Sequence, residues 1–154
     1  LLDVLRGLFN LTVVAADATL GLRSLQAVIE RAGHSLLLSD QTILNSRYNQ
    51  SLLRSLRQAG CSLEHVGLVV ERYHRKLGLE PEKLATLLQL PLTLTLGGDG
   101  LNRIQAMNAG ESLYSFAPRD EYTYGVRRLA QQLLERRTRV ESEGRRGLLG
   151  RLLD

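Results

Sequence analysis

Residues 35–70 read SLLLSDQTILNSRYNQSLLRSLRQAGCSLEHVGLVV: an apolar run, a leucine-rich stretch with helical spacing, and a second apolar run. The two runs, 35–39 and 66–70, are apolar throughout rather than alternating, which is typical of strands buried on both faces of a parallel sheet. The stretch between them, residues 43–59, gathers its leucines on one side of a helix and ends at Gly60. A crossover of this length predicts a right-handed βαβ unit.

The same alternation continues on both sides of this unit. Two further apolar runs, residues 9–16 (FNLTVVAA) and 91–96 (PLTLTL), predict two more strands. Helical patterns fill the stretches between and after the strands, at residues 23–31, 80–88, 101–109 and 121 to about 139. Strands that alternate with helices predict an α/β fold in three layers, a parallel β-sheet with flanking helices.

A change of composition near Arg136 predicts a boundary, because charged residues and glycines replace the mixed pattern there. We expect an α/β domain over residues 1–137, followed by a basic linker and short amphipathic tail over residues 138–154. The linker itself is expected at residues 138–147.

The charge of the chain is concentrated near its C-terminus. The 154 residues include 20 Lys and Arg against 16 Asp and Glu, for a net charge of +4. Residues 1–126 contain 12 of each kind, so the excess lies entirely in the remainder. This distribution does not predict a nucleic-acid-binding face on the domain, and nucleic acid is not an expected partner.

The composition also bounds the cellular setting. No apolar stretch reaches the roughly 18 residues of a membrane-spanning helix, and no signal peptide is visible. The single cysteine, Cys61, cannot form a disulfide within the chain and fits a reducing compartment. We therefore expect a cytoplasmic protein, and the opening Leu1 in place of Met suggests an internal fragment or a processed product.

Several common catalytic motifs are absent from this sequence. Neither lysine, Lys76 or Lys83, follows a glycine-rich turn in the Gly-Lys-Ser/Thr context that cradles phosphates, and no Gly-x-Gly-x-x-Gly opens a helix. The three histidines are scattered without a metal-ligand spacing. We predict no catalytic residue in this stretch of chain.

Two acidic residues invite alternative interpretations. Asp17 follows the apolar run 9–16, which suits either a nucleotide-proximal residue in the second shell of Mg²⁺ or a simple turn cap. Asp99, within the glycine-rich turn 97–100, suits a phosphate-type loop or, more simply, the N-cap of a helix beginning at Leu101.

The order of these pieces resembles the second half of a MinD/ParA-type P-loop ATPase, and in particular the CpaE/TadZ branch of Flp (Tad) pilus assembly proteins. The matching pieces include FNLTVVAAD, SLLLSD and the strand end VVERY at residues 69–73. The most specific match is a set of residues at fixed offsets after the last strand: Asp99, Ala106, Asn108, Gly110 and Leu113. The basic tail ending in GLLGRL is also similar to that branch.

The resemblance implies a partial P-loop NTPase fold, related to the Rossmann-like folds, whose P-loop strand lies upstream. It implies nucleotide-proximal positions at Asp17, Glu71, Arg72 and Asp99, with Asp17 near Mg²⁺. ATP and Mg²⁺ would bind only together with the missing N-terminal half, and no cofactor is expected for this stretch alone. Two departures argue against hydrolysis: Glu71 replaces the family's adenine-recognising Asn, and Ala18 follows Asp17 where active relatives more often have Pro.

Three functions remain open on this basis. The first is an atypical MinD/ParA-like scaffold or localisation protein for a Flp/Tad pilus secretion system, with weak or vestigial nucleotide binding. The second is an active MinD/ParA-type ATPase switch, and the third is a stand-alone α/β interaction domain. The resemblance further implies a homodimer, pilus secretion machinery as partners, and a place at the inner face of the bacterial inner membrane or at the cell pole.

The tail has a pattern of its own. Leucines recur at helical spacing beside arginines, which suits weak contact with an anionic membrane surface; the alternative is a frayed, solvated terminus. The residues of this surface are Arg145, Arg146, Leu148, Leu149, Arg151, Leu152 and Leu153.

Overall fold

The computed structural model describes residues 1–98 and 100–150, without the side chains of Ala18 and of residues 136–150. The strands are β1 (Ser35–Ser39), β2 (Val66–Val70) and β3 (Leu92–Thr95). The helices are α1 (Leu2–Leu8), α2 (Leu22–Arg31), α3 (Ile43–Gln58), α4 (Pro81–Leu88), α5 (Leu101–Ala109), α6 (Leu113–Phe116) and α7 (Glu121–Gly150), with a 3-10 turn, η1 (Ala18–Leu20).

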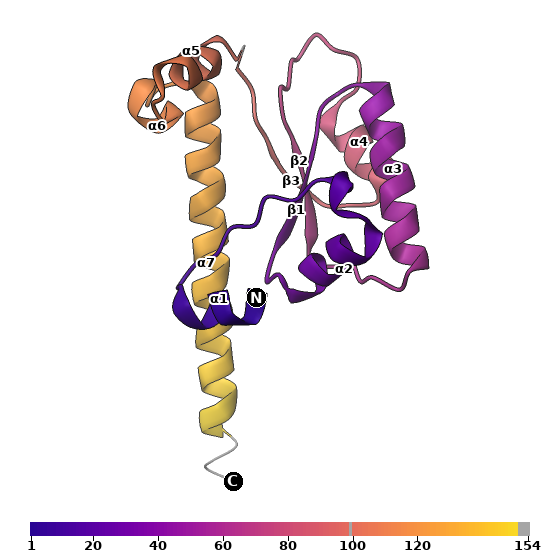
Figure 1. Ribbon diagram of the computed structural model, residues 1–154, viewed down its shortest axis with the longest axis vertical. Coiled ribbons are helices and arrows are strands. Elements are labelled where there is room, and N and C mark those ends of the chain that lie inside the picture. Colours follow the sequence, from indigo (N-terminus) through magenta and orange to yellow (C-terminus); the bar gives the residue numbers. More distant parts are fainter. Residues whose placement is uncertain (99, 151–154) are drawn as a thin grey trace.

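The strands form one parallel sheet in the order β1-β2-β3. Ser35 of β1 pairs with Val66 of β2, and the register then holds through Ser39 and Val70. Each crossover carries a helix, α3 after β1 and α4 after β2 (Figure 1). The prediction of an α/β fold with a parallel sheet and flanking helices is confirmed.

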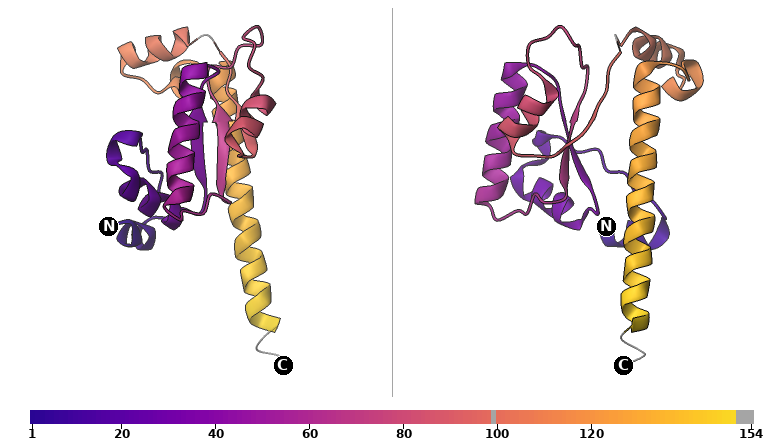
Figure 2. Two further views of the ribbon diagram at one scale, coloured as in Figure 1. Left: turned by 90° about the vertical axis from the view of Figure 1, so that its right-hand side faces the viewer. Right: turned by 180° about the vertical axis from the view of Figure 1, so that it is seen from behind.

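One face of the sheet is covered by α2, α3 and α4 (Figures 1 and 2). β2 is buried over all five residues because it is central and has helices on both sides. The core on this face consists of Leu53, Val66, Leu68, Val70, Leu84, Leu88 and Leu90, and a smaller cluster of Leu25, Leu56 and Cys61 joins α2 to α3.

The opposite face is covered by the upper part of α7, which runs down behind the sheet and extends beyond it (Figure 2). Val69, Leu94 and Leu96 are buried here and pack with Tyr122 and Leu129 of α7. Gly125 lies where α7 meets the sheet: a Cβ there would come 2.6 Å from a methyl group of Leu96. Glycine thus permits this close approach of helix and sheet.

Local signals in the sequence mark several helix ends. Thr42 caps α3 by accepting a hydrogen bond from the Asn45 amide at 3.2 Å, and Pro81 occupies the first turn of α4. Gly110 ends α5 with a φ of 68°, a left-handed conformation that glycine adopts without strain. The residue before helix α5 is Gly100, and Asp99, the predicted cap of this helix, lies outside the described residues.

The predicted strand at residues 9–16 is wrong. This segment is not part of the sheet, and its large side chains face solvent: Phe9 is 58%, Leu11 63% and Val13 85% exposed. A strand requires a partner strand for its backbone groups, and the described sheet consists of β1, β2 and β3 without residues 9–16.

The last helix is longer than the sequence pattern indicates. We expected it to end near residue 139 and a linker to follow at residues 138–147, whereas α7 continues to Gly150. Its glycines and charged residues therefore do not interrupt the helical backbone. Residues 151–154 and the side chains of the tail lie outside the described part of the structure.

Candidate functional site

The carboxyl ends of the three strands meet at one edge of the sheet, at the top of Figure 1. Asp40 follows β1, Glu71 and Arg72 follow β2, and Gly97 lies shortly after β3. Open parallel α/β sheets bind ligands outside this edge, because the loops there bring side chains from several strands together. We take this edge as the candidate site.

Asp40 is fixed by the residues that follow it. Its Oδ1 accepts hydrogen bonds from the amide of Thr42 at 2.9 Å and from the Thr42 hydroxyl at 2.6 Å. Partial burial disfavours the carboxylate, but the Thr42 bonds, a bond from Asn45 and the charge of Arg72 outweigh it and lower the pKa of Asp40. The site therefore holds a negative charge at neutral pH.

Gln41 connects two loops of this edge. Its side chain is 8% exposed. Its Oε1 accepts a bond from the His74 amide at 2.7 Å, and its Nε2 donates to the carbonyl oxygens of Leu79 at 2.7 Å and Leu77 at 3.4 Å. One side chain thus holds the long loop between β2 and α4 against the β1–α3 turn.

Arg72 begins that long loop in a left-handed conformation, with a φ of 53°. This conformation costs a non-glycine residue free energy, so the surrounding hydrogen bonds must hold the backbone in place. Two backbone bonds flank it: the Glu71 amide donates to Ser39 O at 2.8 Å and the Tyr73 amide to Leu96 O at 3.0 Å. The position after β2 is therefore tied to both neighbouring strands.

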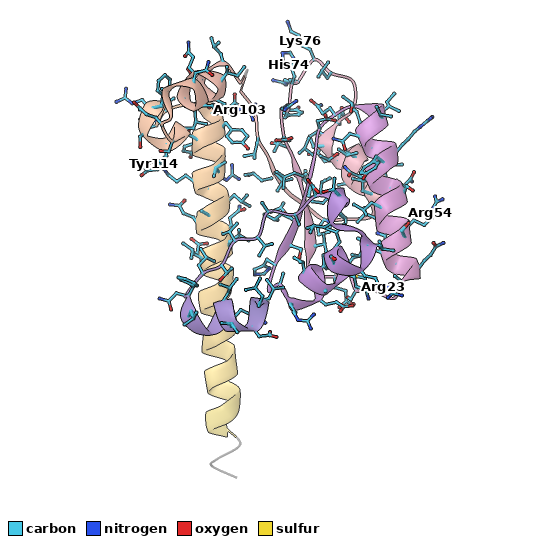
Figure 3. The ribbon with its side chains drawn as sticks, viewed as in Figure 1. Arg23, Arg54, His74, Lys76, Arg103 and Tyr114 are labelled. Atoms are coloured by element: carbon cyan, nitrogen blue, oxygen red, sulfur yellow. The ribbon has the colours of Figure 1, made fainter. Side chains whose placement is uncertain are left out.

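A hollow of about 580 Å³ opens between these two loops. Asp40 and Arg72 are its charged residues; the remaining lining comes from Gln41, Thr42, Ile43, Leu77, Gly78 and Leu79. The tip of the β2–α4 loop lies beyond it, where His74 and Lys76 project at the same end of the molecule as Arg103 (Figure 3). This arrangement offers one fixed carboxylate, one guanidinium and an apolar wall.

The glycine-rich turn after β3 closes the site on the α7 side. A Cβ at Gly97 would collide with the Glu121 carboxylate, and Gly98 has a φ of 98°. Asp120 caps α7 through the Tyr122 amide at 2.9 Å and accepts a bond from Asn102 at 2.7 Å. This turn needs glycine because α7 begins directly against it, which is a structural role.

Asp17 does not lie at the end of a strand, although its position after an apolar run suggests that it does. It is fully exposed, it precedes η1, and its Oδ1 accepts bonds from the Thr19 amide at 2.9 Å and the Thr19 hydroxyl at 2.5 Å. The Thr19 hydroxyl and amide lower the pKa of Asp17. The turn-capping interpretation therefore describes its local structure, because no strand ends there.

The predicted site residues are only partly brought together. Glu71 and Arg72 lie at the candidate edge, and the charge of Arg72 acts on Asp40. No hydrogen bond or ion pair between described residues joins Asp17 to either of them, and Asp99 lies outside the described residues. A nucleotide-proximal role for Asp17, Glu71, Arg72 and Asp99 stays a prediction.

The sequence reasoning missed Asp40, Gln41 and Thr42 as members of this site. The signal for Asp40 and Thr42 was available, since an Asp and a Thr two residues apart directly after a strand favour a capped turn. No local signal marked Gln41, whose partners lie 33 to 38 residues away in the sequence.

Among the described residues, no group of three or more His, Cys, Asp or Glu side chains is placed to hold a metal ion. Within the same part of the chain, no helix has the length and apolar character needed to cross a membrane.

Comparisons with known proteins place the fold. No protein family model matches the chain, and no curated protein matches it by sequence. Among solved structures it is similar to a ParA family ATPase from Chlorobium tepidum TLS, with a TM-score of 0.59 and 12% sequence identity. The likeness covers 66% of this chain and 42% of that chain, so the chain spans less than half of its neighbour's length.

The chain thus has an α/β fold of the kind found in ParA P-loop NTPases, with a three-stranded parallel sheet flanked by helices. This confirms the MinD/ParA-type resemblance at the level of the fold.

Proposed function

We propose that this chain is part of an atypical MinD/ParA-like scaffold or localisation protein for a Flp/Tad-type pilus secretion system, with weak or vestigial nucleotide binding. The similarity of fold to a ParA family ATPase supports the superfamily. The residue pattern VVERY at the end of β2 and the set from Asp99 to Leu113 support the pilus branch.

Glu71 is the observation that favours a scaffold over an active ATPase. It follows β2 directly, at the position where the family resemblance implies an adenine-recognising Asn. A glutamate side chain cannot offer the paired donor and acceptor that the Asn amide presents to the adenine edge. Loss of that pair lowers affinity for ATP and favours a protein that works without a nucleotide cycle.

The proposed partners follow from the same assignment. We propose a homodimer that contacts pilus secretion proteins at the cytoplasmic face of the inner membrane, at or near a cell pole. The tail surface defined by residues 145, 146, 148, 149 and 151–153 supports a weak contact with anionic lipid.

The test is deletion of the gene in its source bacterium, followed by immunodetection of Flp-type pilin on the cell surface. We expect surface pilin to disappear on deletion and to return with the wild-type gene. A Glu71→Asn gene should restore it equally well, because a scaffold does not depend on nucleotide affinity. Unchanged surface pilin in the deletion strain would contradict the pilus assignment, and a gain of function from Glu71→Asn would favour the ATPase switch.

A further inference from the structure

A second hollow, of about 270 Å³, lies between α3 and α4 near the C-terminal ends of both helices. The candidate site lies at the other end of α3, where Thr42 caps the helix. At 1.5 Å per residue, Arg57 is about 22 Å from Thr42 along the axis of α3. The second hollow is therefore separate from the candidate site. Its lining residues are Gln50, Arg54, Arg57, Gln58, Leu87 and Gln89.

The lining of this hollow is rich in hydrogen-bond donors and has no acidic residue. Five of its six residues are Arg or Gln, whose side chains carry N–H groups. Helix α3 as a whole has three arginines and no Asp or Glu. Arg54 and Arg57 lie three residues apart on this helix, and like charges at that spacing repel each other. A negatively charged group in the hollow would offset this repulsion.

Arg57 is held in place by the end of α4. Its Nη2 donates to the carbonyl oxygens of Leu88 at 3.2 Å and Gln89 at 3.3 Å. Gln89 ends α4 in a left-handed conformation, with a φ of 54°. Both printed bonds use Nη2, so the N–H groups on Nε and Nη1 of the same fork remain for a ligand. A guanidinium that is already fixed loses less conformational entropy when it binds.

Arg54 supplies a second guanidinium to the hollow. It is exposed, projects from α3 away from the sheet (Figure 3), and makes no hydrogen bond or ion pair with another residue in the described part of the chain. Gln50 and Gln58 lie one turn before and one turn after it on the same helix. Leu87 of α4, which is 44% exposed, adds an apolar wall.

We infer that this hollow binds a carboxylate side chain from an acidic segment of a partner protein, with an apolar residue of that segment against Leu87. Arginine recognises carboxylates through two parallel N–H bonds, which suits the donors of Arg54 and Arg57. Pockets that enclose small molecules have about 300–1,000 Å³, so a smaller, open hollow suits one side chain presented by a larger molecule. The inference does not depend on the pilus assignment.

The charge balance of the domain favours a protein over a nucleic acid as this partner. Residues 1–126 contain 12 basic and 12 acidic residues, so the two arginines do not belong to a broad basic field. Binding to a phosphate backbone depends on many such charges together, because each neutralised phosphate contributes to the affinity. A single carboxylate needs only the local pair.

The test is an NMR titration of the 154-residue chain with the acetylated and amidated peptide Gly-Glu-Leu-Glu-Gly. The control peptide has Gln in place of both Glu residues. We expect the Glu peptide to shift the Nε–H resonances of Arg54 and Arg57 in a saturable way, and the Gln peptide to leave them unchanged.

Substitutions on α3 then separate this site from general charge attraction. Arg54→Gln should weaken binding of the Glu peptide about three- to fivefold, because exposed charge pairs contribute modestly. Arg47→Gln is the matched control, since it removes the same charge from an exposed position of the same helix outside the hollow, and it should weaken binding less than about twofold. Arg54→Lys keeps the charge but not the planar fork, so it should recover only part of the loss. Unchanged amide shifts in β2 verify that each variant is folded.

Three results would overturn the inference. Equal shifts with the Glu and Gln peptides would mean that the hollow does not recognise a carboxylate. Equal weakening by Arg54→Gln and Arg47→Gln would mean that only the overall charge of α3 matters. Separate titrations use inorganic phosphate and a short DNA duplex, and tighter binding of either one than of the Glu peptide at Arg54 and Arg57 would exclude an acidic protein segment as the preferred ligand.

Discussion

At the scale of single residues, the candidate site depends on a few side chains that hydrogen-bond to partly buried backbone groups. The loop between β2 and α4 has no secondary structure of its own over residues 71–80. Its His74 amide and its Leu77 and Leu79 carbonyls all bond to the side chain of Gln41. Removing one partner from such a set leaves unsatisfied polar groups, which costs more free energy than one hydrogen bond contributes.

Gln41→Ala should therefore destabilise the fold by about 1–3 kcal/mol in urea unfolding. Exchange of the His74 amide should become faster, because its acceptor is removed. Gln105→Ala, at an exposed position on α5, serves as the matched control and should change stability by less than about 0.5 kcal/mol. Equal effects of the two substitutions would show that Gln41 does not hold the loop.

The ionisation of Asp40 makes the stability of the fold depend on pH. Its pKa in the folded chain lies below the unfolded value, so its ionised form stabilises the fold. That contribution is complete above the unfolded pKa of about 3.9 and is lost as the pH falls through the folded pKa. The wild-type chain should therefore exceed Asp40→Asn in stability at pH 7, and the difference should shrink below about pH 4.

Urea unfolding of both proteins at pH 7 and pH 3 measures this difference. Thr42→Val removes the hydroxyl that donates to Asp40 at 2.6 Å. In a chain that carries Thr42→Val, the loss of stability caused by Asp40→Asn should therefore change less between pH 7 and pH 3. A difference between wild type and Asp40→Asn that is the same at both pH values would rule out the proposed ionisation.

At the scale of elements, the sequence predicts those helix ends and strand bounds that are determined by residues close together in the chain. The ends of α4 and α5 follow from Pro81 and Gly110, and three strands lie at or within one residue of their predicted bounds. The error at residues 9–16 has the opposite origin: whether an apolar run forms a strand depends on a partner edge far away in the chain. The hydrogen bonds of Gln41 and the left-handed backbone of Arg72 also depend on residues that are distant in the sequence. No local sequence pattern predicts them.

Gly67 in β2 shows how closely two strands pack on the α7 side. A Cβ at this position would collide with Oγ1 of Thr93 on the neighbouring strand β3. Gly67→Ala should therefore cost about 1–3 kcal/mol of stability, and Thr93→Ala in the same chain should recover part of the loss by removing the obstructing atom.

Thermal and urea unfolding of the two single variants and the double variant form a complete cycle. Gly33→Ala is the control, because no atom lies within 4 Å of a Cβ built there. Additive effects of Gly67→Ala and Thr93→Ala would mean that the two positions do not interact.

At the scale of the whole molecule, the fold and the missing phosphate loop together decide what this stretch of chain can bind. The three strands form a ParA-type sheet edge, and the resemblance implies that the main phosphate contacts come from a loop absent from residues 1–154. The edge described here contributes a fixed carboxylate at Asp40, which repels phosphate.

The 154-residue chain should therefore bind Mg-ATP negligibly. Isothermal titration calorimetry at millimolar ATP is the measurement, and Glu71→Asn is the matched variant: it restores an amide but supplies no phosphate contact, so it should also give no binding. A dissociation constant in the low micromolar range for the wild-type chain would contradict this expectation.

The end of α7 extends beyond the sheet and away from the candidate edge (Figure 2). Burial of its leucines would contribute only a few kcal/mol, and each arginine about 1 kcal/mol near an anionic surface, before the ordering cost is subtracted. One copy should bind vesicles weakly. A dimer with two copies should bind more strongly, through effective concentration.

Co-sedimentation with phosphatidylglycerol-rich vesicles compares the whole chain with a truncation after Arg139, at low and high salt. We expect the whole chain to pellet at low salt and the truncation to stay in solution. A variant with Leu148, Leu149, Leu152 and Leu153 changed to Ser keeps every charge, so it separates apolar insertion from simple attraction and should pellet less than the wild-type chain. Equal pelleting of whole and truncated chains would show that the tail is not an anchor, and its excess of arginine would then have to serve contacts with protein.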